Sequence, residues 1–325
     1  MHDGRRFNRV PPNEREDRRA GKSTIRRRHG EIEGGDMSVS RTVRWAGLAA
    51  VIAGGWSVLA WAGIAESVHN LGVTGSGPSA NGGLRNQFSG TAEICVFCHT
   101  PHGGDASAAI PLWNRNLSDP AIYTTYDQLG TSTLDGQVAD VGSVSIGCLS
   151  CHDGTQAMDS VINEPGSGAD NPGFSAGVWT GDDVVGPADG RLAVGIVQNL
   201  GTDLTNDHPI GIQYGGGGVS ASNPTPPQGE TTDPDFAPVL FKQSNGRYLW
   251  WVDKDWRTGG DGIRTKTDVI LYTRDAANGY PGQAEAEPFV ECASCHDPHT
   301  TENPTFLRIS NTETPSGLCL TCHVK

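Results

Sequence analysis

Cys95-Val-Phe-Cys98-His99 is the first copy of a five-residue pattern that this chain of 325 residues contains four times. In every copy, two cysteines separated by two residues are followed directly by a histidine. The other copies are Cys148-Leu-Ser-Cys151-His152, Cys292-Ala-Ser-Cys295-His296 and Cys319-Leu-Thr-Cys322-His323. All eight cysteines of the chain belong to these copies, so none is left for a disulfide framework.

The pattern has the form of the attachment site of c-type haem. In such a site the thiols bond to the porphyrin and the histidine becomes an axial iron ligand. A zinc ribbon or a redox dithiol also uses Cys-x-x-Cys, but neither needs a histidine directly after the second cysteine. The four copies therefore predict four covalently bound c-type haems. The predicted attachment residues are Cys95, Cys98, Cys148, Cys151, Cys292, Cys295, Cys319 and Cys322, and the predicted proximal ligands are His99, His152, His296 and His323.

The composition is typical of irregular backbone. The chain contains 44 glycines and 20 prolines, and such chains often lack a packed core unless something else supplies it. We expect the haems to supply the core of a mostly irregular multihaem cytochrome c, with short helical turns at the CxxCH motifs. Tyr248–Val252, Asp268–Tyr272 and Pro288–Glu291 read as short strands, which predicts a small antiparallel β element.

The N-terminal part of the chain differs from the rest. Residues 1–36 are rich in arginine and poor in apolar residues, and we interpret them as a disordered leader that precedes the true start at Met37. Residues 37–65 have the form of a cleaved signal peptide, with arginines ahead of an apolar stretch and small residues after it. A retained membrane anchor is the alternative, because the apolar stretch approaches the length that spans a bilayer.

The motif spacing divides the remaining chain into three predicted regions. Residues 66–160 form a haem domain with the first two motifs, and residues 291–325 hold the last two. Residues 161–290 form a Gly/Pro-rich insert that contains a distal histidine and the predicted strands.

The charge of the chain limits its partners. The formal net charge is −13 even though residues 1–36 are rich in arginine. An acidic surface repels nucleic acid and anionic lipid and attracts cations or positively charged mineral surfaces. We therefore expect no nucleic-acid partner. Since no catalytic triad or phosphate-binding loop is visible, the sequence favours an electron-transfer protein over an enzyme.

Four histidines remain outside the motifs and outside residues 1–36, namely His69, His102, His208 and His299. Four irons with two histidine ligands each need four such residues, so we predict that these are the distal ligands. Asp207 is expected to orient the neighbouring imidazole through a hydrogen bond. With both axial positions filled, no iron would be open to a substrate. His69 stands close to the predicted cleavage site, and a histidine of a loose tail is the alternative there.

Two of these histidines lie only three residues beyond a motif histidine: His102 follows His99, and His299 follows His296. Three extended residues reach about 10–11 Å, and a proline stiffens each path. The chain cannot pass around a haem and return to its opposite face within that length. His102 and His299 are therefore each expected to ligate a haem other than the one bound by the adjacent motif, which brings haems close together.

Longer stretches around the motifs carry a resemblance to a known family. They are Cys95-Val-Phe-Cys98-His99-Thr-Pro-His102-Gly, Pro111-Leu-Trp-Asn114, Cys148-Leu-Ser-Cys151-His152-Asp-Gly-Thr155, Asn206-Asp-His208-Pro-Ile-Gly211 and Cys292-Ala-Ser-Cys295-His296-Asp-Pro-His299. From about His69 to Lys325 the chain resembles the multihaem cytochromes of metal-reducing bacteria. It is most similar to the extracellular tetrahaem cytochromes of the outer-membrane cytochrome E type, which polymerise into conductive filaments (nanowires).

The resemblance implies a secreted protein at the cell surface or beyond it, with no stable membrane span after cleavage. It implies stacked bis-histidine haems, copies of the chain as partners, other multihaem cytochromes as donors and metal oxides as candidate acceptors. It also implies one distal histidine from the neighbouring subunit, for which His102 is our candidate and His69 the alternative. A monomeric periplasmic shuttle, a respiratory-complex subunit and a multihaem oxidoreductase with an open haem are the competing hypotheses.

Overall fold

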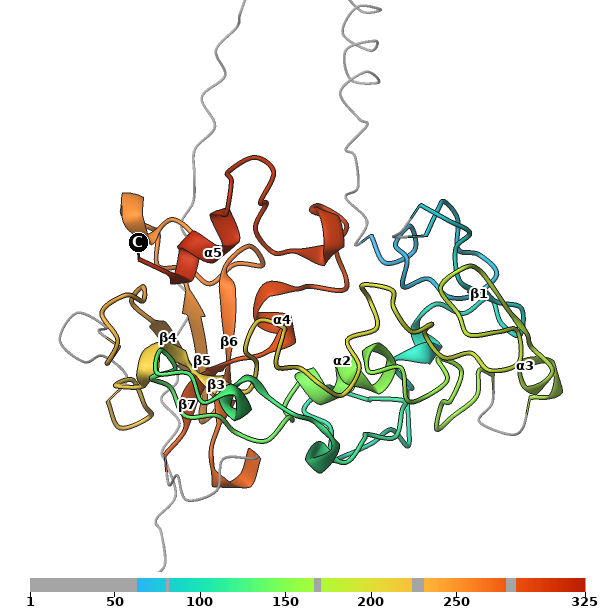
Figure 1. Ribbon diagram of the computed structural model, residues 1–325, viewed down its shortest axis with the longest axis horizontal. Coiled ribbons are helices and arrows are strands. Elements are labelled where there is room, and N and C mark those ends of the chain that lie inside the picture. Colours follow the sequence, from blue (N-terminus) through green and yellow to red (C-terminus); the bar gives the residue numbers. More distant parts are fainter. Residues whose placement is uncertain (1–62, 80–81, 167–170, 224–230, 279–284, 325) are drawn as a thin grey trace, which may run out of the picture. The chain divides into compact units, whose positions relative to one another are not determined.

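A five-stranded antiparallel sheet with the strand order β3-β7-β6-β5-β4 is the largest regular element (Figure 1). The strands are β3 Ile212–Gln213, β4 Leu240–Ser244, β5 Arg247–Val252, β6 Val269–Arg274 and β7 Glu287–Val290. The three stretches predicted as strands coincide with β5, β6 and β7, whereas β3 and β4 were not predicted. All five strands lie within the predicted insert.

The computed structural model describes residues 63–79, 82–166, 171–223, 231–278 and 285–324. The predicted leader, residues 1–36, and nearly all of the predicted signal peptide, residues 37–65, lie outside this part. The described residues belong to one compact unit, Ala60–Lys325, and the region boundaries at residues 160 and 290 remain predictions. No helix within the described ranges combines the length and the apolar character that crossing a membrane requires.

The turn between β4 and β5 follows from the dipeptide Asn245-Gly246. Both residues have positive φ angles, 50° and 75°, and Ser244 pairs with Arg247 across the turn. Asn-Gly is the preferred sequence for such a two-residue hairpin because both positions tolerate left-handed backbone. The dipeptide Asn245-Gly246 therefore predicts a hairpin, and with it the strand β4.

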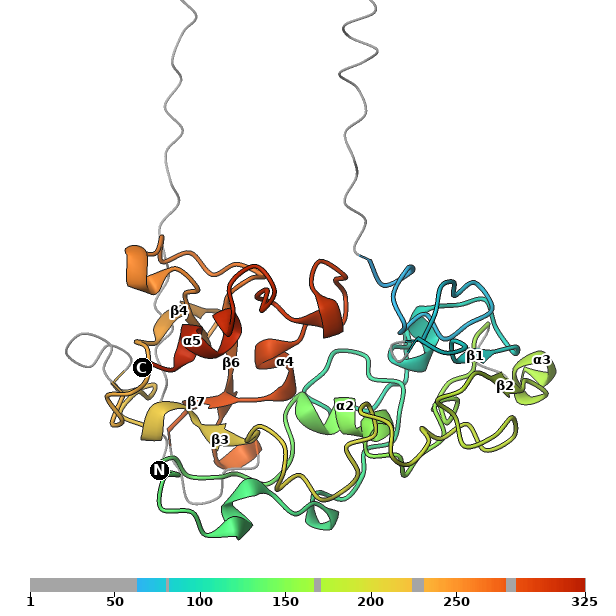
Figure 2. The same cartoon turned by 45° about the horizontal axis from the view of Figure 1, so that its top comes forward.

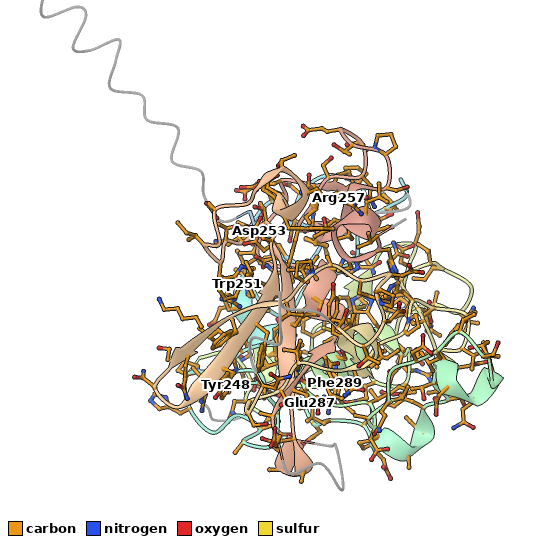
Figure 3. All side chains as sticks on the ribbon, turned by 90° about the vertical axis from the view of Figure 1, so that its left-hand side faces the viewer. Tyr248, Trp251, Asp253, Arg257, Glu287 and Phe289 are labelled. Carbon is orange, nitrogen blue, oxygen red and sulfur yellow. The ribbon has the colours of Figure 1, made fainter. Side chains whose placement is uncertain are left out.

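The sheet supplies an apolar core of its own. Trp250 and Val252 of β5 are fully buried, and Val269 and Leu271 of β6 pack with them. The other buried members of this cluster are Tyr214, Val219, Ala237, Val239 and Val290. Side chains alternate between the two faces along a strand, and Figure 3 shows the sheet with Tyr248 and Trp251 of β5 labelled. This part of the molecule therefore packs around protein side chains.

Replacing Thr273 by valine tests the hydrogen bond between Trp250 and Thr273 in this core. Thr273 Oγ1 accepts a hydrogen bond from the indole nitrogen of the fully buried Trp250 at 3.1 Å. Valine would leave that donor unpaired, so we expect the free energy of unfolding to fall by about 1–3 kcal/mol. Denaturant titration measures the change. Thr133→Val, at an exposed position, is the control, and an equal effect of both variants would contradict the role of the hydrogen bond.

Helices are short throughout the described residues, and the CxxCH motifs lie on them. The first motif begins with the 3-10 helix η1 Cys95–Phe97, and the others lie on α2 Ser145–His152, α4 Cys292–Cys295 and α5 Gly317–Cys322. The further helices are α3 Pro172–Ser175, η2 Pro120–Ile122, η3 Tyr126–Leu129, η4 Tyr214–Gly216, η6 Trp256–Thr258, η7 Ala276–Asn278 and η8 Pro304–Phe306. A helical turn brings both thiols of a motif to one side.

A small second sheet lies beside the first motif. It pairs β1 Gln87–Phe88 with β2 Trp179–Thr180. Phe88 and Trp179 pack with Phe97 of the first motif, and all three are almost completely buried. The first motif is thus anchored by aromatic packing, while the haem-cored character of the whole fold remains a prediction.

Candidate haem centres

Three of the four motif histidines are oriented by the same kind of contact. In each of them the ring nitrogen Nδ1 lies within hydrogen-bond distance of a backbone carbonyl. The pairs are His99 with Pro111 O at 2.9 Å, His152 with Gln198 O at 2.8 Å and His296 with Thr305 O at 2.7 Å. A carbonyl only accepts, so Nδ1 must carry the proton and the lone pair lies on Nε2. Proteins orient metal-binding histidines in this way.

Two distal candidates lie close to motif histidines from other parts of the chain. The ring centres of His69 and His152 are 6.1 Å apart, and those of His99 and His299 are 6.2 Å apart. Bonds from a metal to an imidazole nitrogen measure about 2.0–2.1 Å, and each nitrogen lies about 1.1 Å from its ring centre. Two imidazoles on opposite sides of one metal ion thus have centres about 6.3 Å apart. Both ring distances therefore match a pair of histidines that would hold one iron between them.

His69 belongs to the packed part of the protein. Its ring lies parallel to that of Phe306, with ring centres 4.5 Å apart. Burial, with a smaller contribution from His152, lowers the pKa of His69 to about 3. The imidazole is therefore neutral at physiological pH, which is the form that binds a metal. The alternative of a loose tail does not describe this residue.

His102 lies on the surface, although its backbone is firmly held. Its carbonyl accepts hydrogen bonds from Thr100 Oγ1 at 3.0 Å and Asn163 Nδ2 at 3.1 Å. The side chain is exposed. Within the described ranges, the imidazole of His102 has neither a hydrogen bond nor a ring contact. The ring is thus presented to solvent from a fixed backbone.

His208 is also exposed, and its Nδ1 faces the carbonyl of Pro209 at 3.1 Å. The prediction that Asp207 orients this ring is wrong. One carboxylate oxygen of Asp207 is buried without a hydrogen-bond partner, and burial raises the pKa of the group. The carbonyl of Pro209 lies next to the His208 ring, at the position where we expected the carboxylate of Asp207. The loop continues to Gly211, whose N–H donates to Val290 O at 2.8 Å.

The thiols of successive motifs are neighbours in the structure. In Figures 1 and 2, α2, α4 and α5 follow one another in this order. In three pairs of motifs, the thiol of one motif contributes, together with burial, to the raised pKa of a cysteine in the other motif. The pairs are Cys98 with Cys151, Cys148 with Cys292 and Cys322 with Cys295, and the pKa of Cys98 and of Cys322 rises to about 12. The four motifs thus form a row in sequence order.

A buried ion pair connects the second motif to the third. Arg274 Nε lies 2.8 Å from Glu291 Oε1, and these side chains are 1% and 0% exposed. Ser145, at the start of α2, donates to the second carboxylate oxygen and accepts a hydrogen bond from the N–H of Cys292 at 2.9 Å. Burial raises the pKa of Glu291, although Arg274 and Ser145 oppose this. The sequence did not predict this cluster, since its members lie far apart in the chain.

The fourth motif is held by the loop after β5. The indole nitrogen of Trp256 donates to Thr321 O at 3.0 Å, and Arg257 Nη2 donates to His323 O at 2.9 Å. Figure 3 labels Arg257 at this end of the sheet. The ring of His323 packs against Phe236, with centres 4.7 Å apart.

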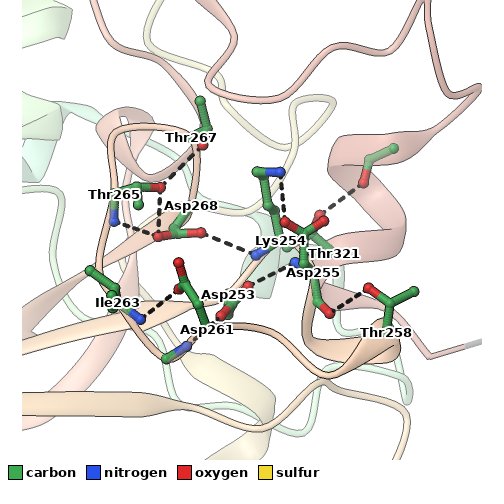
Figure 4. Close-up of polar contacts among 12 residues, drawn as sticks. Asp253, Lys254, Asp255, Thr258, Asp261, Ile263, Thr265, Thr267, Asp268 and Thr321 are labelled. Atoms are coloured by element: carbon green, nitrogen blue, oxygen red, sulfur yellow. Dashed lines mark hydrogen bonds and ion pairs between the residues drawn. The ribbon is translucent and has the colours of Figure 1, made fainter.

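Acidic side chains in the same loop accept hydrogen bonds from backbone N–H groups (Figure 4). Asp253 accepts from the N–H groups of Asp255 and Gly262 at 2.8 and 3.1 Å. Asp268 accepts from the N–H of Lys254 at 3.1 Å. Among the residues that the structure describes, no group of three or more His, Cys, Asp or Glu side chains is arranged to hold a metal ion. These carboxylates close the loop that supports the fourth motif.

Comparison with known protein families gives a match in the last part of the chain. A family model described as a doubled CXXCH motif matches residues 287–325, which include the third and fourth motifs. The match indicates a multihaem c-type cytochrome with covalently bound haem, and hence electron transfer rather than catalysis. No curated protein matches the chain.

Proposed function

We propose that this protein carries electrons along four bis-histidine haems and is the repeating subunit of an extracellular filament. The observation that carries the proposal is the pair of histidine contacts at 6.1 and 6.2 Å, each between a motif histidine and a distant histidine. The held Nδ1 atoms of three motif histidines support it, because they leave Nε2 free for iron. Bound haem would supply a one-electron iron couple at each motif.

The distances favour particular ligand pairs in the first half of the row. His299 is the distal partner of His99, and His69 is the distal partner of His152. In the first pair, His99 belongs to the first motif and His299 follows the third, which agrees with the argument that a histidine three residues beyond a motif cannot serve the haem of that motif. The pair requires His299 to lie near the first motif.

The remaining two histidines are assigned from their surroundings. His208 lies three residues before Gly211, whose N–H donates to Val290, and Val290 stands two residues before Cys292. We therefore assign His208 to the third motif as the partner of His296. These assignments leave His102 as the distal candidate for the fourth motif.

His102 of a second copy is the ligand that we assign to His323. The His102 ring is exposed, and its backbone is fixed by two hydrogen bonds. His69, the alternative candidate for this role, is half-buried, and its ring lies against those of Phe306 and His152. A ligand that enters the next subunit would link the copies head to tail through iron, and repetition of such a contact produces an open filament.

The proposal is tested on protein produced with its haem-attachment machinery and purified from the secreted fraction. We expect four haems per chain by mass spectrometry, low-spin spectra for all of them and filaments in electron micrographs. Fewer haems would contradict the cofactor assignment. Discrete particles at high concentration would favour the periplasmic shuttle or the respiratory-complex subunit. A high-spin haem in the native assembly would favour an oxidoreductase with an open iron.

A further inference from the structure

Phe306 lies in a short loop that is fixed to the third motif by backbone hydrogen bonds. The N–H of Asp297 donates to Phe306 O at 2.8 Å. Two residues further on, the N–H of Arg308 donates to Cys295 O at 2.8 Å. The backbone on both sides of the Phe306 ring is therefore held by the segment that contains the third motif.

The same loop has an unusual backbone. Thr305 and Phe306 have φ angles of 54° and 62°, which side chains with a β-carbon rarely adopt. This conformation turns Thr305 O toward Nδ1 of His296 at 2.7 Å. A backbone of this kind persists where surrounding contacts hold it. The loop thus has a fixed shape, and this shape sets the direction of the Phe306 ring.

The ring of Phe306 lies flat against the imidazole of His69. The ring centres are 4.5 Å apart, and the planes differ by only 8°. The Nδ1 atom of His69 is buried without a hydrogen-bond partner among the residues that the structure describes. Rotation of the imidazole about its Cβ–Cγ bond would drive its edge into the phenyl ring. The stack therefore fixes the plane of His69.

The two close histidine pairs differ in the angle between their rings. The planes of His69 and His152 cross at 81°, whereas those of His99 and His299 differ by 24°. The ring of His152 is itself held by the carbonyl of Gln198 at 2.8 Å, so both planes of the crossed pair are fixed. At almost equal ring distances, one pair is crossed and the other is nearly parallel.

The angle between two axial imidazole planes affects the iron between them. Each imidazole interacts most strongly with the iron dπ orbital that lies perpendicular to its plane. Parallel planes act on the same orbital and separate the two dπ energies, whereas crossed planes act on one orbital each and leave these energies nearly equal. A low-spin ferric haem with crossed planes therefore has the more anisotropic magnetic resonance signal, with the larger maximum g value. Proteins tune bound haem through its axial ligands.

We infer that Phe306 positions the imidazole of His69 across that of His152, so that the haem of the second motif has crossed ligand planes and the haem of the first has nearly parallel ones. The inference rests on the proposed function, which supplies the haems. Phe306 is a positioning residue, because it touches the candidate ligand and acts through it. The loop of the third motif thereby sets the ligand geometry of the second.

Electron paramagnetic resonance of the oxidised, haem-loaded protein tests the inference. The wild type should give a highly anisotropic low-spin signal that His69→Ala removes. Phe306→Leu keeps an apolar side chain but loses the flat ring, and it should lower the maximum g value of that signal. Phe306→Tyr keeps the ring and should preserve the signal. Phe241→Leu, at another half-buried phenylalanine that packs on Tyr248 and Trp250, is the control and should leave the spectrum unchanged.

The outcomes separate this inference from the proposed function. Wild-type protein without haem would refute the function. Fully low-spin, haem-loaded wild type that shows only the signals of parallel ligand planes would overturn the inference alone, and this result depends on no variant. A His69-dependent signal that is the same in Phe306→Leu as in the wild type would overturn the positioning role. Equal changes in Phe306→Leu and Phe306→Tyr would assign the effect to a disturbed loop and would also overturn it.

Discussion

Replacing His102 by alanine is expected to abolish filaments while the chain still folds and binds its full complement of haem. The substitution removes an exposed ring that has no hydrogen bond or ring contact within the described residues, so the fold loses nothing. According to our ligand assignment, the variant lacks the ligand that one copy supplies to His323 of the next. One haem per chain should therefore become high-spin, and electron micrographs should show single particles.

Added imidazole provides the matched control for this variant. It fills a vacant axial position without linking two chains, so it should restore a fully low-spin spectrum but no filaments. His208→Ala, at another exposed distal candidate, should also produce one high-spin haem, while the intersubunit ligand stays intact. A His102→Ala variant that still polymerises and remains fully low-spin would refute the intersubunit role of this histidine.

Replacing Glu291 by alanine is expected to lower the free energy of unfolding by about 3–5 kcal/mol, because it removes the carboxylate that balances the buried charge of Arg274. The carboxylate also accepts a hydrogen bond from Ser145, so the contact between α2 and α4 should loosen. Denaturant titration of the haem-loaded protein measures the loss. The exposed pair of Arg191 and Asp189 offers the control, and Asp189→Ala should leave the free energy of unfolding almost unchanged.

A double variant distinguishes the ion pair from simple packing. Arg274→Met combined with Glu291→Leu replaces both charges by apolar groups of similar size, and such replacements often recover stability. We expect the double variant to be more stable than Glu291→Ala. If it is equally destabilised, the hydrogen bonds of this cluster to Ser145 and the backbone, and not the unpaired charge, account for the loss.

The sequence predicts those strands and turns that a short stretch of residues marks by itself. The three stretches predicted as strands coincide with β5, β6 and β7 because they are short apolar segments bounded by turn residues. The hairpin residues Asn245-Gly246 carried an equally local signal for β4. β3 consists of Ile212–Gln213 alone, and two residues are too few for a periodic pattern to mark them.

The buried polar residues could not be read from the sequence. Arg115, Arg274 and Glu291 look like ordinary charged surface residues in the chain, and most charged residues are exposed. Only the packing of Asn114 against the first motif directs Arg115 into the second. In the same way, the prediction for Asp207 failed because a neighbouring backbone carbonyl competed with its carboxylate.

The sequence by itself determined where c-type haem can be attached, at the CxxCH motifs, and how many further histidines are candidate ligands. It also predicted that a histidine three residues beyond a motif ligates a different haem from that of the motif. These statements follow from residue types and short chain lengths. Only the tertiary structure decided which histidines meet. The ring of His69 lies close to that of His152, and the ring of His299 lies close to that of His99, because packing between segments far apart in the chain sets those distances. No local pattern encodes such contacts.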